Sequence, residues 1–247
     1  MSERSDRPTV QIEGVVPSSE VRQMLIDQGK PVLLAFSRGK DSIAAWIALK
    51  EAGIEIIPFH LIRVPGVKFV EESLQYFEEV FGQHIYRIPH PSMLRQLRKS
   101  LFRDPATAAL IDAADIPPIV YEDVDDIMRL HYAERTTWVA DGVRAVDSIR
   151  RRLSMKKTGS IYAKTRKCHP VWDWRVAAIR NAMAEHNIEL PIDYELFGRS
   201  WDGLQYDFIA PLAERFPDDY EVVKTWFPMV EGVLVRRELE EKYGYTT

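Results

Sequence analysis

The first half of the chain alternates short, continuous apolar runs with longer helical stretches. Residues 31–36 and 54–59 are almost entirely apolar, which is typical of strands buried on both faces of a parallel sheet. The apolar stretch 43–49 between them is closed by Gly53, and residues 69–81 repeat their apolar side chains at helical spacing. This order predicts a βαβ unit followed by a further helix.

The same alternation continues along the chain. Residues 84–88 and 136–140 are expected to form further strands, and the region 91–133 between them is mostly helical, with prolines at 105, 117 and 118 as breakers. Further helices are expected from an N-cap at Ser18 or Ser19 to near Gly29, at 174–187, at 207–215 and at 219–243. The expected fold class is α/β, with a doubly wound, mostly parallel sheet and a helical C-terminal region.

These elements divide the chain into three expected parts. Residues 1–17 lack amphipathic periodicity and are expected to form a loose arm, or an edge strand at 9–12. Residues 18–205 are expected to form the α/β domain, and residues 206–247 a C-terminal helical extension.

Composition narrows the class of protein. At 247 residues and 46% hydrophobic content, the chain can bury a full core. Its net charge of -4 excludes the overall basic field of a general nucleic-acid binder, so only local basic clusters can support such a role. The polar N-terminus, and the lack of a run of roughly 18 apolar residues, predict a protein without a membrane partner.

Cys168 is the single cysteine in the sequence. It cannot form an internal disulfide or supply a multi-thiolate zinc or iron–sulfur site, so we expect neither cofactor and a reducing, cytoplasmic location. A packed, inert thiol is its expected role. The alternative is a lone nucleophile activated by the adjacent Lys167 and His169.

A polar loop follows the first buried strand. It consists of Ser37, Arg38, Gly39, Lys40, Asp41 and Ser42. A helix beginning at Asp41 or Ser42 would bring backbone N–H groups and its positive end to one point, which favours an anion. The Asp41 carboxylate repels a phosphate unless it caps the helix or helps to hold Mg²⁺. An ordinary βα turn with a capping aspartate is the alternative interpretation.

Residues 36–42 resemble the SGGKDS signature of the PP-loop ATP pyrophosphatase superfamily, and differ from it by Arg38 in place of the first glycine. The Arg38 side chain is expected to point either to solvent or to the phosphates. The segment lacks the GxxxxGK[ST] spacing of a Walker loop. The resemblance therefore implies cleavage between the α- and β-phosphates of ATP.

Later segments are similar to the phosphoadenylylsulfate (PAPS) reductase-like branch of that superfamily, with the similarity extending over residues 30–205. They are 67–73, which resembles an FPET-like helix start; 141–152, which is similar to G-[IV]-R-x-x-[ED]-S-x-x-R; and 169–174 with 188–194, which resemble P-[IL]-x-D-W … I-P-x-x-x-L-Y. The branch implies an adenine nucleotide alpha hydrolase-like fold, in which Asp173 and Trp174 cap and pack a helix. Its reductases use a C-terminal ECGIH-like thiol motif, which residues 241–247 do not contain, so thiol-dependent sulfonucleotide reduction is not expected.

The segment 141–152 supplies a second set of candidate ligand contacts. Gly142, Arg144 and Arg151 follow the strand 136–140, on the edge where open α/β sheets bind ligands. Arginine forks suit phosphate or sulfate oxygens. The alternatives are a solvated basic helix, or a surface in 144–167 that grips a nucleic-acid backbone.

Two further candidates have simpler alternatives. His60, at the end of the second strand, is where the superfamily often contacts adenine or ribose, although a core or surface histidine is the alternative. The acidic run 122–126 is a candidate for binding Mg²⁺, whereas a solvated helix start is the favoured interpretation.

The leading hypothesis is an enzyme that binds ATP with Mg²⁺, adenylates an unidentified acceptor and releases pyrophosphate. Lys40, Asp41 and Arg144 are its expected catalytic residues, with Asp41 as the candidate Mg²⁺ ligand. The expected nucleotide contacts are Ser37, Arg38, Gly39, Lys40, Asp41, Ser42, His60, Gly142, Arg144 and Arg151. A PAPS-like adenine nucleotide is the second candidate ligand.

Two alternatives stay open at this stage. One is a non-catalytic nucleotide-binding module of a larger complex, with the aromatic C-terminal region as a partner surface. The other is an enzyme of nucleic-acid modification, which rests on the basic residues between 144 and 167. A homo-oligomer is compatible with each of these functions.

Overall fold

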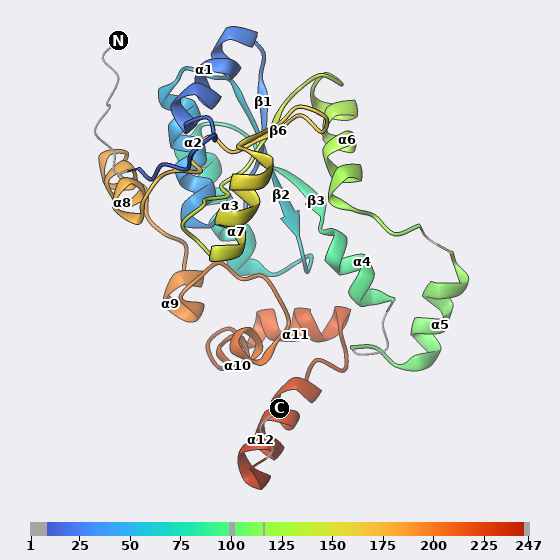
Figure 1. The fold of residues 1–247 in the computed structure, drawn as a ribbon. Coiled ribbons are helices and arrows are strands. Elements are labelled where there is room, and N and C mark those ends of the chain that lie inside the picture. The colour runs from blue at the N-terminus through green and yellow to red at the C-terminus, as the bar shows by residue number, and fades with distance from the viewer. Residues whose placement is uncertain (1–8, 99–101, 116, 245–247) are drawn as a thin grey trace. The chain divides into compact units, whose positions relative to one another are not determined.

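The computed structural model describes residues 9–98, 102–115 and 117–244 (Figure 1). Its strands form one six-stranded sheet in the order β3-β2-β1-β4-β6-β5. The strands are β1 (Val32–Ala35), β2 (Ile56–Ile62), β3 (Tyr86–Pro89), β4 (Val139–Ala140), β5 (Ile161–Tyr162) and β6 (Lys167–Cys168). The expected α/β class with a mostly parallel sheet is therefore confirmed.

The register places β1 at the centre of the parallel part of the sheet. Leu33 on β1 is opposite Ile57 on β2 and Val139 on β4, and both pairings are parallel. β4 also pairs in parallel with β6, whereas β5 pairs antiparallel with β6. Because parallel strands end at the same edge, the residues that follow β1, β4 and β6 meet there.

In the view of Figure 1, the strands β1, β2 and β6 lie between α2 and α6. The helices are α1 (Ser18–Gln28), α2 (Lys40–Glu51), α3 (Lys68–Phe81), α4 (Pro91–Leu97), α5 (Pro105–Ala113), α6 (Tyr121–Tyr132), α7 (Ile149–Thr158), α8 (Val176–Glu185), α9 (Asp193–Phe197), α10 (Tyr206–Arg215), α11 (Pro217–Trp226) and α12 (Gly232–Tyr243). None of the helices in the described ranges is long and apolar enough to cross a bilayer.

The chain divides into two compact units. The first unit comprises Met1–His60, Gln83–Tyr86 and Glu122–Leu190, and the second comprises Leu61–Gly82, Arg87–Tyr121 and Pro191–Thr247. The first unit contains β1, β4, β5 and β6 together with α1, α2, α7, α8 and α6 from Glu122 onward.

Helix α2 is apolar because it is buried on every side. All residues from Ser42 to Leu49 are buried, and the helix packs against α8, whose Ile179 and Ala182 are also buried. A helix without a polar face is stable only inside a core. The run 43–49 therefore predicted this helix correctly, although the helix begins earlier, at Lys40.

The predicted N-cap of the first helix is wrong. Ser18 is the first residue inside α1, and its backbone N–H donates to Asp173 Oδ2 at 2.9 Å. A carboxylate from a distant part of the chain thus stabilises the helix start. Asp173 does cap a helix, as the resemblance implies, but the helix is α1.

In the second unit, an aspartate from a distant part of the chain likewise caps a helix, α3. The backbone N–H groups of Lys68 and Phe69 donate to the two carboxylate oxygens of Asp219, at 2.7 and 3.1 Å. Around this cap the Phe69 ring packs against Phe197, Trp201 and Phe216. An aromatic core therefore joins α3 to the C-terminal helices.

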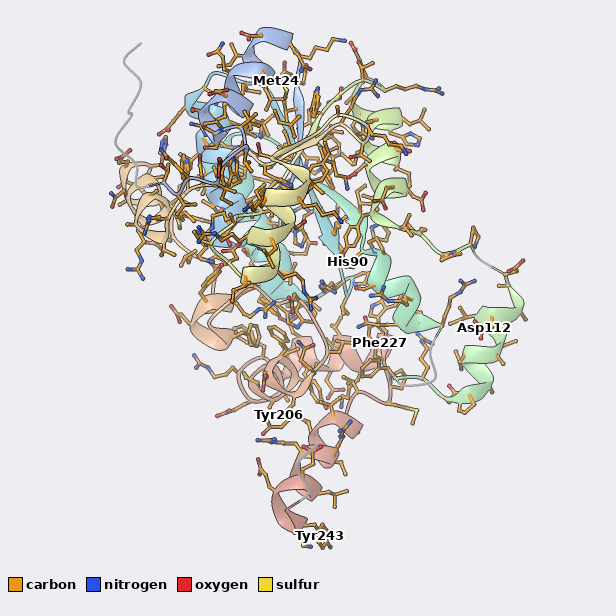
Figure 2. All side chains as sticks on the ribbon, viewed as in Figure 1. Met24, His90, Asp112, Tyr206, Phe227 and Tyr243 are labelled. Carbon is orange, nitrogen blue, oxygen red and sulfur yellow. The ribbon has the colours of Figure 1, made fainter. Side chains whose placement is uncertain are left out.

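The C-terminal region is helical, as expected, but its last predicted helix is divided. The predicted helix 219–243 is two helices, α11 and α12, because Pro228 lies between them and cannot continue a helix. Figure 2 labels Tyr206 at the start of α10, Phe227 directly after α11, and Tyr243 at the end of α12. The proline breaks this segment without separating it from the core, since Phe227 is fully buried.

The other differences concern short strands. The predicted strand 136–140 pairs only at Val139–Ala140, and the hairpin of β5 and β6 was not predicted. The hairpin strands contain two residues each, which is too short for alternation to be read from the sequence. The predicted edge strand at 9–12 is limited to one bridge between Thr9 and Trp174.

Candidate functional site

The loop after β1 is held by its own two serines. The Ser37 backbone N–H donates to Ser42 Oγ at 3.2 Å, and Ser42 Oγ donates to the Gly39 carbonyl at 2.8 Å. The hydroxyl groups of Ser37 and Ser42 lie 3.1 Å apart. Ser42 is buried and shapes the loop, whereas Ser37 is exposed and can contact a ligand.

Helix α2 begins inside this loop, with Gly39 as its N-cap. No side chain accepts a hydrogen bond at this N-cap, and the Ser42 backbone N–H donates to the Gly39 carbonyl at 3.0 Å. The Lys40 ammonium is partly exposed beside them and lies 3.0 Å from Asp41 Oδ2. The positive end of a helix dipole and a lysine thus lie at one point, an arrangement that favours an anion. Anion binding at this loop stays a prediction.

Of the two directions expected for the Arg38 side chain, to solvent or to the phosphates, the structure excludes solvent. The φ of Arg38 is +64°, in the left-handed region that favours glycine. Its side chain is 1% exposed and is among the largest fully buried side chains of the described residues. The arginine therefore occupies a glycine conformation and turns its cation into the protein.

Arg144 joins the loop to the segment after β4. Its Nε lies 2.7 Å from Asp41 Oδ1, its Nη2 donates to Asp147 Oδ1 at 2.6 Å, and its Nη1 donates to the Trp174 carbonyl at 3.0 Å. The residue is only 2% exposed. This geometry gives Arg144 a positioning role, since its guanidinium holds Asp41 and Asp147 in place.

Gly142 lies against the loop backbone. A Cβ atom at position 142 would lie 2.5 Å from the Asp41 carbonyl carbon and 2.6 Å from the Ser42 amide nitrogen. Real Cβ contacts are essentially never this short, so any side chain here displaces the backbone of α2 or of the 141–144 segment. The glycine is required because two backbone segments meet at this position.

A carboxylate–histidine pair lies at the same sheet edge, and the sequence pattern did not predict it. His169 Nδ1 is 2.6 Å from Asp141 Oδ1, which also accepts the Val143 backbone N–H at 2.9 Å. Asp141 follows β4 directly and His169 follows β6, so their positions after two parallel strands were the available signal. A histidine oriented by a carboxylate is a common arrangement for a general base.

His60 is buried within β2, two residues before its end. Its Nδ1 lies 2.7 Å from the Phe36 carbonyl oxygen, so this nitrogen carries the proton and donates. Phe36 is the residue immediately before the loop. The histidine therefore supports the loop base, and contact with adenine or ribose stays a prediction.

Arg151 contacts the same carboxylate as Arg144. Its Nη1 lies 2.5 Å from Asp147 Oδ2, and its backbone N–H donates to Ser148 Oγ, the N-cap of α7. The guanidinium is half exposed. Asp41, Arg144, Asp147 and Arg151 thus form a chain of alternating charges from the loop to α7.

Cys168 is fully buried, and burial raises the pKa of its thiol far above the ordinary value, with a further increase from the Asp141 charge. The thiol stays protonated at neutral pH and is a poor nucleophile. This geometry supports the packed, inert role.

The residues present do not fit a Mg²⁺ ion held by the protein. The Asp41 carboxylate is already neutralised by Lys40 and Arg144, and no group of three or more acidic, histidine or cysteine side chains that could hold a metal ion occurs in the described ranges. In the acidic run 122–126, Asp125 pairs with Lys167 and Asp126 with Arg129. Asp125 is buried and joins α6 to β6, whereas the exposed Asp126 pairs within α6.

The second unit contains a separate polar cluster that was also not predicted. His90 Nδ1 accepts the Ser92 N–H at 2.9 Å, and Arg63 Nη1 donates to Ser92 Oγ at 2.7 Å. Burial, together with the charges of Arg63 and Arg95, lowers the pKa of His90 to about 4. His90 is therefore neutral at physiological pH.

No protein-family model matches the chain, and no curated protein matches it. Among solved structures, the chain is similar to one described as the crystal structure of a predicted subunit of tRNA methyltransferase from Methanocaldococcus jannaschii DSM. The two are 19% identical, with a TM-score of 0.36, and the match covers 77% of this chain and 91% of the other. The fold class rests on the strand order and pairing described above.

Proposed function

We propose that this chain binds an adenine nucleotide at the Ser37–Ser42 loop and transfers its adenylyl group to an acceptor, releasing pyrophosphate. The observation that supports this most directly is the meeting of the loop, Gly142 and Arg144 at the carboxyl edge of the parallel sheet. This edge is where open α/β folds bind ligands. The loop also resembles the PP-loop signature, which is associated with cleavage between the α- and β-phosphates.

The proposed reaction is a substitution at the α-phosphorus. An acceptor oxygen attacks this phosphorus, the bond to the α,β-bridging oxygen breaks, and its electron pair leaves with pyrophosphate. The α2 amides and the Lys40 ammonium are placed to stabilise the negative charge on the leaving group. His169, oriented by Asp141, is the candidate base that removes the acceptor proton.

Arg144 and Asp41 take positioning roles in this proposal. Their contact fixes the first turn of α2 relative to the 141–144 segment. It thereby fixes the distance between the Ser37–Ser42 loop and His169, the candidate general base. Catalysis of this kind depends on accurate placement of groups. Mg²⁺, if needed, would arrive bound to the nucleotide phosphates, where it neutralises charge.

Nucleotide binding can be measured by calorimetry with ATP and with its α,β-methylene analogue, which cannot be cleaved at the bond in question. We expect both to bind, and Lys40→Ala to weaken binding at least tenfold. Lys50→Ala is a matched control, because Lys50 is an exposed lysine in the last turn of the same helix. No binding of either nucleotide, or equal weakening by both variants, would overturn the proposal.

Turnover separates an enzyme from a binding module. Pyrophosphate release from ATP, and not from the methylene analogue, is expected when a suitable acceptor is present. ATP binding without release across a broad panel of carboxylates, carbonyl compounds and nucleic acids would instead support the non-catalytic module. Competition between ATP and PAPS at the same loop would test the second candidate ligand.

A further inference from the structure

The segment from Ser148 to Lys167 is strongly basic within a chain that is acidic overall. It contains eight lysines and arginines and no aspartate or glutamate, whereas the whole chain has a net charge of -4. These residues form α7, β5, the intervening turn and the first residue of β6. The segment lies wholly in the first unit.

Helix α7 is attached to the protein by little of its surface. Met155 is its only buried residue, and it packs into a small cluster with Val15, Ala145 and Trp172. The rest of α7 is exposed, including Ile149 at 81% and Leu153 at 62%. The helix therefore presents most of its circumference to solvent.

Only two of the eight cations in this segment form ion pairs with the described residues. Arg151 pairs with Asp147, and Lys167 pairs with Asp125. For five others, no carboxylate of the described residues lies within ion-pair distance: Arg150, Arg152, Lys156, Lys157 and Lys164. Helix α12 differs in this respect, because its Arg236 and Arg237 both pair with glutamates of the same helix.

The arrangement around α7 favours a large polyanion. At 100° per residue, Arg150 and Lys157 lie on one side of the exposed strip formed by Ile149 and Leu153, and Arg152 and Lys156 lie on the other. Lys164 adds a further cation on the exposed β5–β6 turn. Two exposed apolar residues are too few to hold a ten-residue helix in a bilayer, since interfacial helices need an extended apolar face.

We propose that α7 and the β5–β6 turn form a binding surface for the phosphate backbone of a polynucleotide. The surface consists of Arg150, Arg152, Lys156, Lys157 and Lys164. This inference is independent of the nucleotide site, because none of these residues belongs to the Ser37–Ser42 loop. Backbone recognition by lysine and arginine is largely independent of sequence and is weakened by salt.

The test measures the anisotropy of fluorescent 20-nucleotide single strands and duplexes, of both RNA and DNA, at several salt concentrations. We expect binding at 50 mM salt that falls steeply by 200 mM. The triple variant Arg152→Gln, Lys156→Gln, Lys157→Gln should lose at least tenfold in affinity. For a single strand, the slope of the logarithm of the binding constant against the logarithm of the salt concentration should become shallower by about 2, since each phosphate contact contributes roughly 0.7.

A charge-matched control lies on α12. Arg236→Gln, Arg237→Gln, Lys242→Gln removes the same charge from another exposed helix and should leave binding unchanged. Lys164→Gln tests the hairpin separately and should give a smaller loss. Absence of oligonucleotide binding at 50 mM salt, or equal loss in both triple variants, would overturn the proposal.

Two further measurements separate this surface from a membrane-binding surface and from the nucleotide site. Stronger binding to vesicles with anionic lipids than to oligonucleotides would assign the surface to a membrane and refute the proposal. Calorimetry with ATP should give wild-type affinity for the α7 triple variant. If oligonucleotides bind but ATP does not, only the proposed nucleotide function fails.

Discussion

Gly142 and Asp41 meet backbone to backbone, with only 2.5 Å between the Asp41 carbonyl carbon and the position of a Cβ at residue 142. This contact joins the end of β4 to the first turn of α2. The geometry of the loop therefore depends on a residue that lies far from it in the sequence. A substitution at Gly142 should therefore change the loop without removing any of the loop's own side chains.

Gly142→Ala should weaken both the fold and the nucleotide site. A methyl group here forces two backbone segments apart, which we expect to lower the free energy of unfolding by about 1–3 kcal/mol and to weaken ATP binding. Urea unfolding and calorimetry measure the two effects. Gly232→Ala is the control, because a Cβ at position 232 meets nothing within 4 Å; similar losses in both variants would show that the close approach at Gly142 is not the cause.

Arg38 provides a test of backbone strain. The variants Arg38→Gly and Arg38→Ala both remove the guanidinium, but only glycine adopts a φ of +64° without penalty. We expect the glycine variant to be more stable than the alanine variant by about 1 kcal/mol. Denaturant unfolding of the pair measures this difference, and equal stabilities would show that the left-handed conformation costs nothing.

The contact between Arg144 and Asp41 should be energetically coupled. Arg144→Leu leaves the carboxylates of Asp41 and Asp147 without their buried partner, so we expect a loss of about 3 kcal/mol in unfolding free energy. Asp41→Asn removes one of the two negative charges that Arg144 neutralises. The double variant should therefore lose less than the sum of the single variants, with a coupling of about 0.5–3 kcal/mol. Additive losses would show that the two residues act independently.

His169 should affect turnover and not nucleotide affinity. His169→Gln removes the candidate base, so we expect pyrophosphate release to fall by at least tenfold while the affinity for ATP stays near the wild-type value. His186→Gln is the control, because His186 pairs with Glu51 away from this edge; a large loss of ATP affinity in His169→Gln would assign it a structural role.

His90 should make the fold less stable in acid. Its pKa is lowered from 6.5 to about 4 in the folded protein, so below pH 6.5 the unfolded chain takes up a proton that the folded chain does not. Stability from this residue is therefore complete above pH 6.5 and is lost as the pH falls toward 4. His90→Asn should reduce the change in unfolding free energy, measured with urea, between pH 6.5 and pH 4. A pH dependence as steep as that of the wild type would contradict the prediction.

Local patterns in the sequence predicted the main framework of the fold. The run at 31–36 contains β1, the run at 54–59 contains the first part of β2, and the helix at 69–81 agrees with α3 to within one residue. These elements were predictable because burial leaves a local pattern in the sequence. The pattern is a continuous apolar run in the two strands and helical spacing in α3. The loop between β1 and α2 was predictable for the same reason, since its position follows from the two elements around it.

Features that depend on distant residues were not predictable in this way. No local pattern shows that Asp173 caps α1, that Asp219 caps α3, or that Arg144 is buried against Asp41. The pairing of Asp141 with His169 likewise requires the order of β4 and β6 in the sheet. The candidate site was thus located by its loop, but the roles of its charged residues came from the structure.

Because Asp219 caps α3 from the C-terminal part of the chain, α3 lacks this cap until that part has been synthesised. The start of α3 leaves the ribosome 151 residues before the aspartate that holds its first amide. At ordinary rates of translation this interval is on the order of ten seconds. During that time the amides of Lys68 and Phe69 bind water, and the helix acquires its final cap only when α11 has emerged.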